Sequence, residues 1–277
     1  MVIKKKRQNK AVNRTGALLL ILTWLFASIS QGIIIRHDVA PGEYVLSPED
    51  FPQVFYLERQ GRSRVCAATL VDSYWALTAA HCVDETSLAE TIENGQEFMV
   101  EISNRRHEID QVVTHPDYLS EIRPEVDLAL LRFKESITIP QPIPISELTN
   151  ELGATITLVG WGYFGLGTTG RQYDDGEKRW AHNRVTQADQ RLRSFFDDPR
   201  EIDNSVLPLE GTLGLGDSGG PALMETGDGI IVAGIAIGEI EGVGYTEETQ
   251  GRYGSTAIYE RVSMHVDWIK SVIYLDK

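Results

Sequence analysis

Cysteine is scarce in this chain, whose 277 residues include only Cys66 and Cys82. A small scaffold held together by several disulfides is therefore excluded. A zinc site is also disfavoured, because no Cys-x-x-Cys pair is present and His81 lies directly beside Cys82. The two thiols can form one disulfide in an exported protein, or they can remain buried and free.

Basic residues are also few. The chain has 26 lysines and arginines against 40 aspartates and glutamates, a formal net charge of −14. Residues 1–16 contain no acidic residue but hold six of the basic ones, namely Lys4, Lys5, Lys6, Arg7, Lys10 and Arg14. The rest of the chain is therefore more acidic than the total suggests.

The N-terminal segment has the layout of a signal peptide. The basic stretch is followed by an apolar run from Ala17 to Ile29 and then by the small residues Ser30 and Gly32. This order of charged, apolar and small residues predicts a signal peptide over residues 1–32 that is removed on export. An uncleaved membrane anchor is the alternative, because residues 15–35 carry no charge.

Removal of residues 1–32 would leave 20 basic residues against 40 acidic ones, a formal net charge of −20. Such a surface repels nucleic-acid phosphates and anionic lipids. We therefore expect neither a nucleic-acid partner nor a membrane partner for the mature protein. The acidic excess is explained most simply by the solubility of an exported protein.

Short runs rich in β-branched and aromatic residues predict an all-β fold. Examples are 54–57, 67–71, 75–79, 155–159 and 230–237. Prolines at 140, 142 and 144 indicate a crossing between two halves, 33–145 and 146–277. Helical spacing of apolar residues predicts a terminal helix within 263–275. Residues 163–210 are polar, and we expect loops there.

Three motifs indicate nucleophilic catalysis. In chain order they are Leu77–Cys82 (LTAAHC), Asp127–Leu131 (DLALL) and Gly216–Pro221 (GDSGGP). A serine hydroxyl is a weak nucleophile near pH 7 unless an imidazole takes its proton and a carboxylate orients that imidazole. It also requires backbone N–H groups aimed at the developing oxyanion. The three motifs together supply these groups.

These motifs resemble those of the chymotrypsin/trypsin family of serine endopeptidases. Further similarities are the runs CAATL, GWG and IYERV at 66–70, 160–162 and 258–262. The resemblance covers residues 33–277 and implies two packed six-stranded antiparallel β-barrels with a C-terminal helix. It further implies a secreted or periplasmic monomer of bacterial type, with a protein or peptide substrate and no metal or organic cofactor.

The resemblance also assigns roles within the motifs. It implies His81 as general base, Asp127 as its orienting carboxylate and Ser218 as nucleophile, with the N–H groups of Gly216 and Ser218 as oxyanion donors. It pairs Cys66 with Cys82 in a disulfide next to the base.

Asp217 would pair with the free α-amino group of a new N-terminus. The family usually has Arg or Lys before that N-terminus, whereas Gln31 and Gly32 precede Ile33 here. We therefore expect signal peptidase itself to release Ile33, with Ile34 as a less favoured alternative.

Substrate choice is less defined. The resemblance places Thr212 at the base of the specificity pocket, and Ala257 replaces a glycine that is common there and should shorten the pocket, which favours small or medium uncharged side chains. Glu239 and Glu241 could instead attract a basic side chain. One departure from the family is the run 234–238 (GIAIG), which lacks the serine that usually bonds to the catalytic aspartate.

Two other classes of protein fit part of the pattern. The GxSxG spacing around Ser218 also suits an α/β-hydrolase esterase, although that fold requires a helix directly after the serine and a later histidine. A binding module built on a protease fold is the stronger alternative, because a fold can persist without its chemistry.

Overall fold

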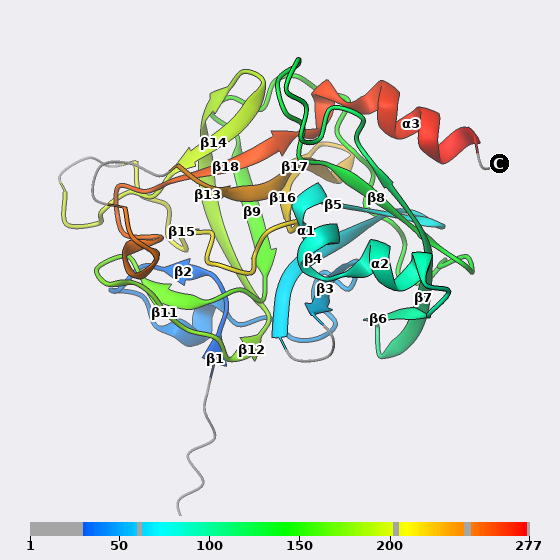
Figure 1. Cartoon of the computed structure of the whole chain (residues 1–277). Coiled ribbons are helices and arrows are strands. Elements are labelled where there is room, and N and C mark those ends of the chain that lie inside the picture. The colour runs from blue at the N-terminus through cyan, green and yellow to red at the C-terminus, as the bar shows by residue number, and fades with distance from the viewer. Residues whose placement is uncertain (1–29, 60–62, 202–204, 241–244, 276–277) are drawn as a thin grey trace, which may run out of the picture.

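A computed structural model of the protein describes residues 30–59, 63–201, 205–240 and 245–275 (Figure 1). The predicted signal peptide lies almost entirely outside these residues, and its first described part is the short strand β1 (Ser30–Gln31). Two six-stranded antiparallel β-barrels make up most of the described chain, which confirms the predicted fold class. Within the described residues, no helix has both the length and the apolar character needed to cross a membrane.

The first barrel is a six-stranded sheet with the strand order β3-β4-β5-β8-β7-β6. Its strands are rich in valine, isoleucine and leucine, and β5 and β8 are almost entirely buried. Their apolar side chains form one core together with residues of the connecting segments, and this core extends to Val159, Leu223 and Ile235 in the later part of the chain. The bounds are β3 (Val54–Arg59), β4 (Ser63–Asp72), β5 (Trp75–Thr78), β6 (Phe98–Ile102), β7 (Arg105–Thr114) and β8 (Ala129–Phe133).

The second barrel is closed, with the strand order β13-β14-β18-β17-β16-β9. The bounds are β9 (Thr155–Gly160), β13 (Arg179–Ala188), β14 (Arg191–Phe195), β16 (Pro221–Thr226), β17 (Gly229–Glu239) and β18 (Thr256–Arg261).

The expectation of loops throughout 163–210 is wrong, because this region supplies two barrel strands and three short ones. The short strands are β10 (Phe164–Leu166), β11 (Gly170–Tyr173) and β12 (Gly176–Glu177). In β13 the buried positions alternate as expected, but two of them are the polar residues Arg179 and Asn183. Arg179 pairs with buried Asp175, and Asn183 donates a hydrogen bond to the carbonyl oxygen of Gly211. Because two of the buried positions are polar, a hydrophobicity pattern does not reveal the strand.

The segment around residue 34 packs on the second half of the chain. Strand β2 (Ile34–Ile35) pairs in parallel with β10 and antiparallel with β15 (Gly211–Thr212). Tyr44, at the end of the 3₁₀ helix η1 (Pro41–Tyr44), belongs to the core of the second barrel. The start of the described chain therefore lies against the barrel that comes later in the sequence.

The C-terminal helix makes the reciprocal contact. It follows the 3₁₀ helix η3 (Val262–Met264) and spans α3 (Val266–Leu275), within the predicted range. Its buried Ile269 and Ile273 belong to the core of the first barrel. Figure 1 shows α3 extending past β8. The remaining helices are α1 (Ala80–Glu85), α2 (Leu88–Glu93) and the 3₁₀ helix η2 (Glu247–Thr249).

Candidate active site

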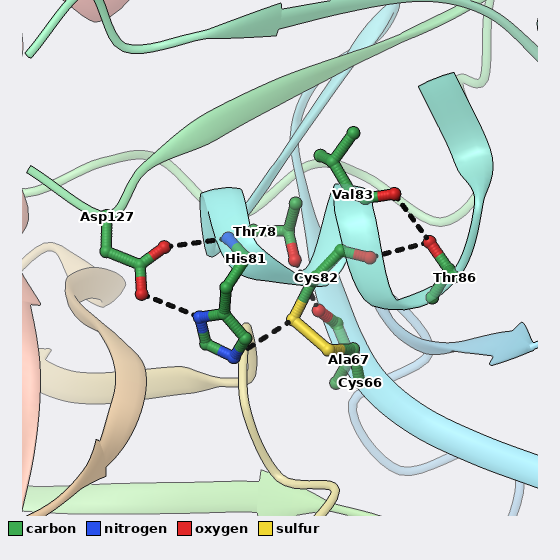
Figure 2. The surroundings of a disulfide bond; sticks show 8 residues. All are labelled: Cys66, Ala67, Thr78, His81, Cys82, Val83, Thr86 and Asp127. Atoms are coloured by element: carbon green, nitrogen blue, oxygen red, sulfur yellow. Dashed lines mark hydrogen bonds and ion pairs between the residues drawn. A yellow bond between two sulfur atoms is a disulfide. The ribbon is translucent and has the colours of Figure 1, made fainter. Parts of the chain in front are cut away.

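Strand pairing brings His81 and Asp127 together. In the ladder between β5 and β8, Thr78 lies opposite Ala129. His81 follows Thr78 in the first turn of α1, and Asp127 precedes β8 by two residues. The backbone N–H of His81 donates to Oδ1 of Asp127 at 2.9 Å, and Nδ1 of His81 lies 2.6 Å from Oδ2 (Figure 2).

The Asp127 carboxylate favours the charged form of His81. Burial of the imidazole pulls its pKa down, but the hydrogen bond to Asp127 and the negative charge of that carboxylate outweigh burial. The pKa of His81 is therefore raised above its ordinary value. With Nδ1 occupied by Asp127, Nε2 is the ring nitrogen left for proton transfer, and its one contact shown in Figure 2 is with the disulfide sulfur Sγ of Cys82 at 3.8 Å.

Ser218 lies in the turn between β15 and β16, and the first barrel holds this turn. The backbone N–H of Ala67 in β4 donates to the carbonyl oxygen of Ser218 at 2.7 Å. The next residue, Gly219, has a φ of 76°, and a Cβ placed there would lie 2.2 Å from the carbonyl oxygen of Ala67. Glycine is therefore required for the close approach of the serine turn to β4.

One cavity of about 370 Å³ is lined by His81, Asp127 and Ser218. His81 and Ser218 are both partly exposed, whereas Asp127 is buried. The three residues named by the motifs therefore come together, two from the first barrel and one from the second. Pro221 begins the strand β16, so no helix follows the serine, and the α/β-hydrolase alternative is wrong.

The backbone around Ser218 offers two N–H groups without a protein acceptor. Gly216 has a φ of 96°, a conformation that favours glycine. Among the described residues, the N–H groups of Gly216 and Ser218 donate to no other protein atom. The arrangement can bind a developing negative charge.

Asp217 is fully buried beneath this turn. Its carboxylate accepts hydrogen bonds from the backbone N–H groups of Gly162 at 2.7 Å and Gly214 at 2.8 Å, and also from that of Ile33. Burial raises the pKa of Asp217 to about 7, against the opposing effect of these N–H donors. A Cβ at Gly160 would lie 2.0 Å from the same carboxylate, which explains a glycine in the GWG run.

Cys66 and Cys82 form a disulfide with an S–S distance of 2.01 Å (Figure 2). It links β4 to α1 directly beside His81. The two sulfurs and a His81 nitrogen lie within 4.8 Å of one another, a spacing that would suit a metal ion. The S–S bond removes both thiolates, however, so this group cannot act as a Cys₂His site.

Of the residues proposed for the specificity pocket, some line the cavity that contains Ser218 and others do not. Thr212 and Ala257 are fully buried, and neither lines the cavity that contains Ser218. Glu239 does line that cavity, is half-buried, and accepts a hydrogen bond from the N–H of Gly251 at 2.8 Å. Burial raises the pKa of Glu239 to about 7. Glu241 lies outside the described residues.

The run 234–238, which lacks the serine expected from the family resemblance, lies next to the cavity. Ile237 lines the cavity where the family pattern has a serine. A separate contact involves the backbone of the same aspartate: the N–H of Asp127 donates to Oε1 of Glu260 in β18 at 3.1 Å. Sequence reasoning assigned no role to Glu260, although a glutamate inside the apolar run 257–262 is a signal for a buried carboxylate that needs a partner.

Comparison with known proteins identifies the family. The sequence model of the Trypsin family matches residues 42–269. The match covers most of the chain, and the chain therefore belongs to this family and has a serine protease fold. The more specific expectation of a bacterial-type member stays a prediction.

Relatives come from several animals. Phenoloxidase-activating factor 3 of Holotrichia diomphalia is 27% identical over 230 residues, which cover 74% of this chain and 63% of that protein. This chain thus matches less than two thirds of the length of the beetle protein. Kallikrein-8 of Homo sapiens is 24% identical over 91% of this chain and 95% of its own length. Trypsin II-P29 of Gallus gallus is 24% identical, with 92% and 98% covered.

Proposed function

We propose that this protein is a secreted serine endopeptidase that acts on a protein or peptide substrate. The observation that carries the proposal is the position of His81, whose Nδ1 is bound by Asp127 and whose ring shares a cavity wall with Ser218. Family membership supports the same reaction class. The mature form acts as a monomer without a membrane partner.

In the proposed reaction, Nε2 of His81 accepts the proton of Ser218 Oγ as Oγ attacks the carbonyl carbon of the scissile bond. The N–H groups of Gly216 and Ser218 stabilise the oxyanion, and removal of one such donor costs about 2.7–4 kcal/mol. Collapse of the tetrahedral intermediate breaks the C–N bond, and His81 protonates the leaving amine. Water activated by His81 then hydrolyses the acyl-enzyme ester.

Activation is proposed to occur when signal peptidase cuts after Gly32. The new α-ammonium group of Ile33 would pair with Asp217, whose carboxylate already accepts the Ile33 N–H. This ion pair would compensate the buried charge of Asp217 and hold the Gly216–Ser218 backbone. N-terminal sequencing of the exported protein tests the hypothesis, since a start at neither Ile33 nor Ile34 would exclude this mechanism.

The lining of the cavity favours a basic substrate side chain over the small uncharged one that Thr212 and Ala257 suggested. Carboxylates of Glu85, Glu125 and Glu239 line it together with the catalytic groups. No lysine or arginine is among the described lining residues. A substrate cation would therefore gain favourable electrostatic interactions in this cavity.

Covalent labelling tests the main proposal. A fluorophosphonate should label the mature wild type, and S218A should lose both labelling and hydrolysis of a peptide substrate. Circular dichroism of S218A confirms that the variant is folded. Wild-type protein that is folded and correctly processed, yet neither labelled nor active, would favour the binding-module alternative.

A further inference from the structure

A partly buried ion pair of the second barrel lies behind the catalytic aspartate. Arg191 in β14 and Glu260 in β18 are directly opposite each other in the strand register. Nη2 of Arg191 lies 2.6 Å from Oε1 of Glu260, whose side chain is only 2% exposed. A carboxylate this deeply buried requires good compensation, and Arg191 supplies part of it, while Nε2 of His265 lies 3.8 Å from Oε2.

The same two side chains hold the backbone on both sides of Val126. Oε1 of Glu260 accepts the N–H of Asp127 at 3.1 Å, and Nη2 of Arg191 donates to the carbonyl oxygen of Glu125 at 3.0 Å. Residues 124–128 form neither helix nor strand, and the first half of the chain holds this segment through two backbone hydrogen bonds, from the His115 N–H to the carbonyl oxygen of Leu128 and from the Val126 N–H to that of Asp117. The position of this segment is thus set only in part by the other barrel.

From this geometry we infer that Glu260, fixed by Arg191, is a positioning residue for the catalytic aspartate and acts through the backbone N–H of Asp127. The inference rests on the proposed function. Asp127 binds both the backbone N–H and Nδ1 of His81. A shift of the Asp127 backbone would therefore move the imidazole relative to Ser218.

Two substitutions separate the hydrogen bond from the charge. E260D keeps the charge but withdraws the carboxylate by about 1.5 Å, the length of one C–C bond. E260Q loses the charge but keeps an oxygen at the position of Oε1. The matched control is E151D, because Glu151 forms a buried pair with Arg261, the neighbour of Glu260 in β18, at 2.7 Å and contacts no triad residue.

We expect E260D to lower kcat by about 10- to 100-fold, since a misplacement of about 1 Å can cost this much. The decrease in kcat should be smaller in E260Q than in E260D, and E151D should keep the wild-type kcat. The acid limb of kcat/KM, which reports the pKa of the essential base, should move to lower pH in E260D only. Rates are normalised by active-site titration, so that they refer to folded enzyme.

Three results would overturn the inference while leaving the proposed function intact. They are an E260D variant with the kcat and acid limb of E151D, an E260Q variant as impaired as E260D, and an E151D variant with the same kcat loss as E260D. A wild-type protein that neither reacts with a fluorophosphonate nor cleaves peptides would instead refute the proposed function, and the inference with it.

Discussion

The N–H of Ala67 and the carbonyl oxygen of Ser218 are 2.7 Å apart, so a strand of the first barrel binds the serine turn of the second. The disulfide joins Cys66, the residue before Ala67, to Cys82, the residue after His81. His81 and Ser218 are therefore both fixed relative to β4.

The approach of the serine turn to β4 leads to a first prediction. G219A would place a Cβ 2.2 Å from the carbonyl oxygen of Ala67, in a backbone conformation that favours glycine. We expect kcat/KM to fall by about 100-fold, because Ser218 is displaced from His81. G227A is the control, since a Cβ there meets nothing within 4 Å. Equal activity of the two variants would contradict the prediction.

A second prediction concerns Asp127. D127N should lower kcat by about 10⁴-fold, as expected when the base loses its orienting carboxylate. The base must be neutral, so wild-type activity declines as the pH falls through the raised pKa of His81. Without the carboxylate, burial should lower that pKa and move the acid limb to lower pH. D110N, which removes a carboxylate paired with Arg132, serves as control and should leave the pH profile unchanged.

The disulfide gives a third prediction, on stability. Cys66 and Cys82 are 16 residues apart, and closing such a loop stabilises a protein by about 3 kcal/mol in the chain-entropy model. The double substitution C66A/C82A should lower the free energy of unfolding by about this amount in urea. A reducing agent should lower the free energy of unfolding of the wild type to that of the double variant, and it should leave the double variant unaffected. A wild type that is equally stable under reduction would argue against the prediction.

Lys178 provides a fourth prediction, on pH and stability. Its Nζ donates to the carbonyl oxygens of Asp50 and Phe51, and burial lowers its pKa to about 8 from 10.5. Between these two values the unfolded chain binds a proton that the folded chain does not. The contribution of Lys178 to stability should therefore rise with pH in this window. The free energy of unfolding of the wild type minus that of K178M, measured in urea, should increase from pH 8 to 10.5. A difference that stays constant over this range would refute the prediction.

The fifth prediction addresses specificity. Glu239 has a pKa of about 7, so its carboxylate is mostly neutral below this pH and charged above it. The ratio of kcat/KM for substrates with arginine and with leucine before the scissile bond should rise as the pH increases through 7. In E239Q the ratio should be lower and independent of pH over this range. E225Q, on the exposed end of β16, is the control, and an identical ratio in both variants would exclude a role for Glu239.

The all-β class and the terminal helix could be predicted from local residue patterns, the two barrels were implied by the family resemblance, and the three motifs pointed to residues that line one cavity. Strand β13 could not be predicted, since the charged residue Arg179 is buried there through its pairing with Asp175. The Arg191–Glu260 pair depends on strand register between segments far apart in the chain. Contacts of this kind leave no periodic signal in the sequence.

Each end of the described chain packs against the barrel formed by the other half of the chain. This packing predicts what happens when the chain is cut between the barrels. A break within 140–144 would leave the N-terminal fragment without Ile269 and Ile273, which complete its apolar interior. The other fragment would lack Ile33, Ile35 and Tyr44 for the same reason. Neither fragment should be stable alone, whereas a mixture of the two should reassemble, so the molecule is one cooperative unit despite its duplicated architecture.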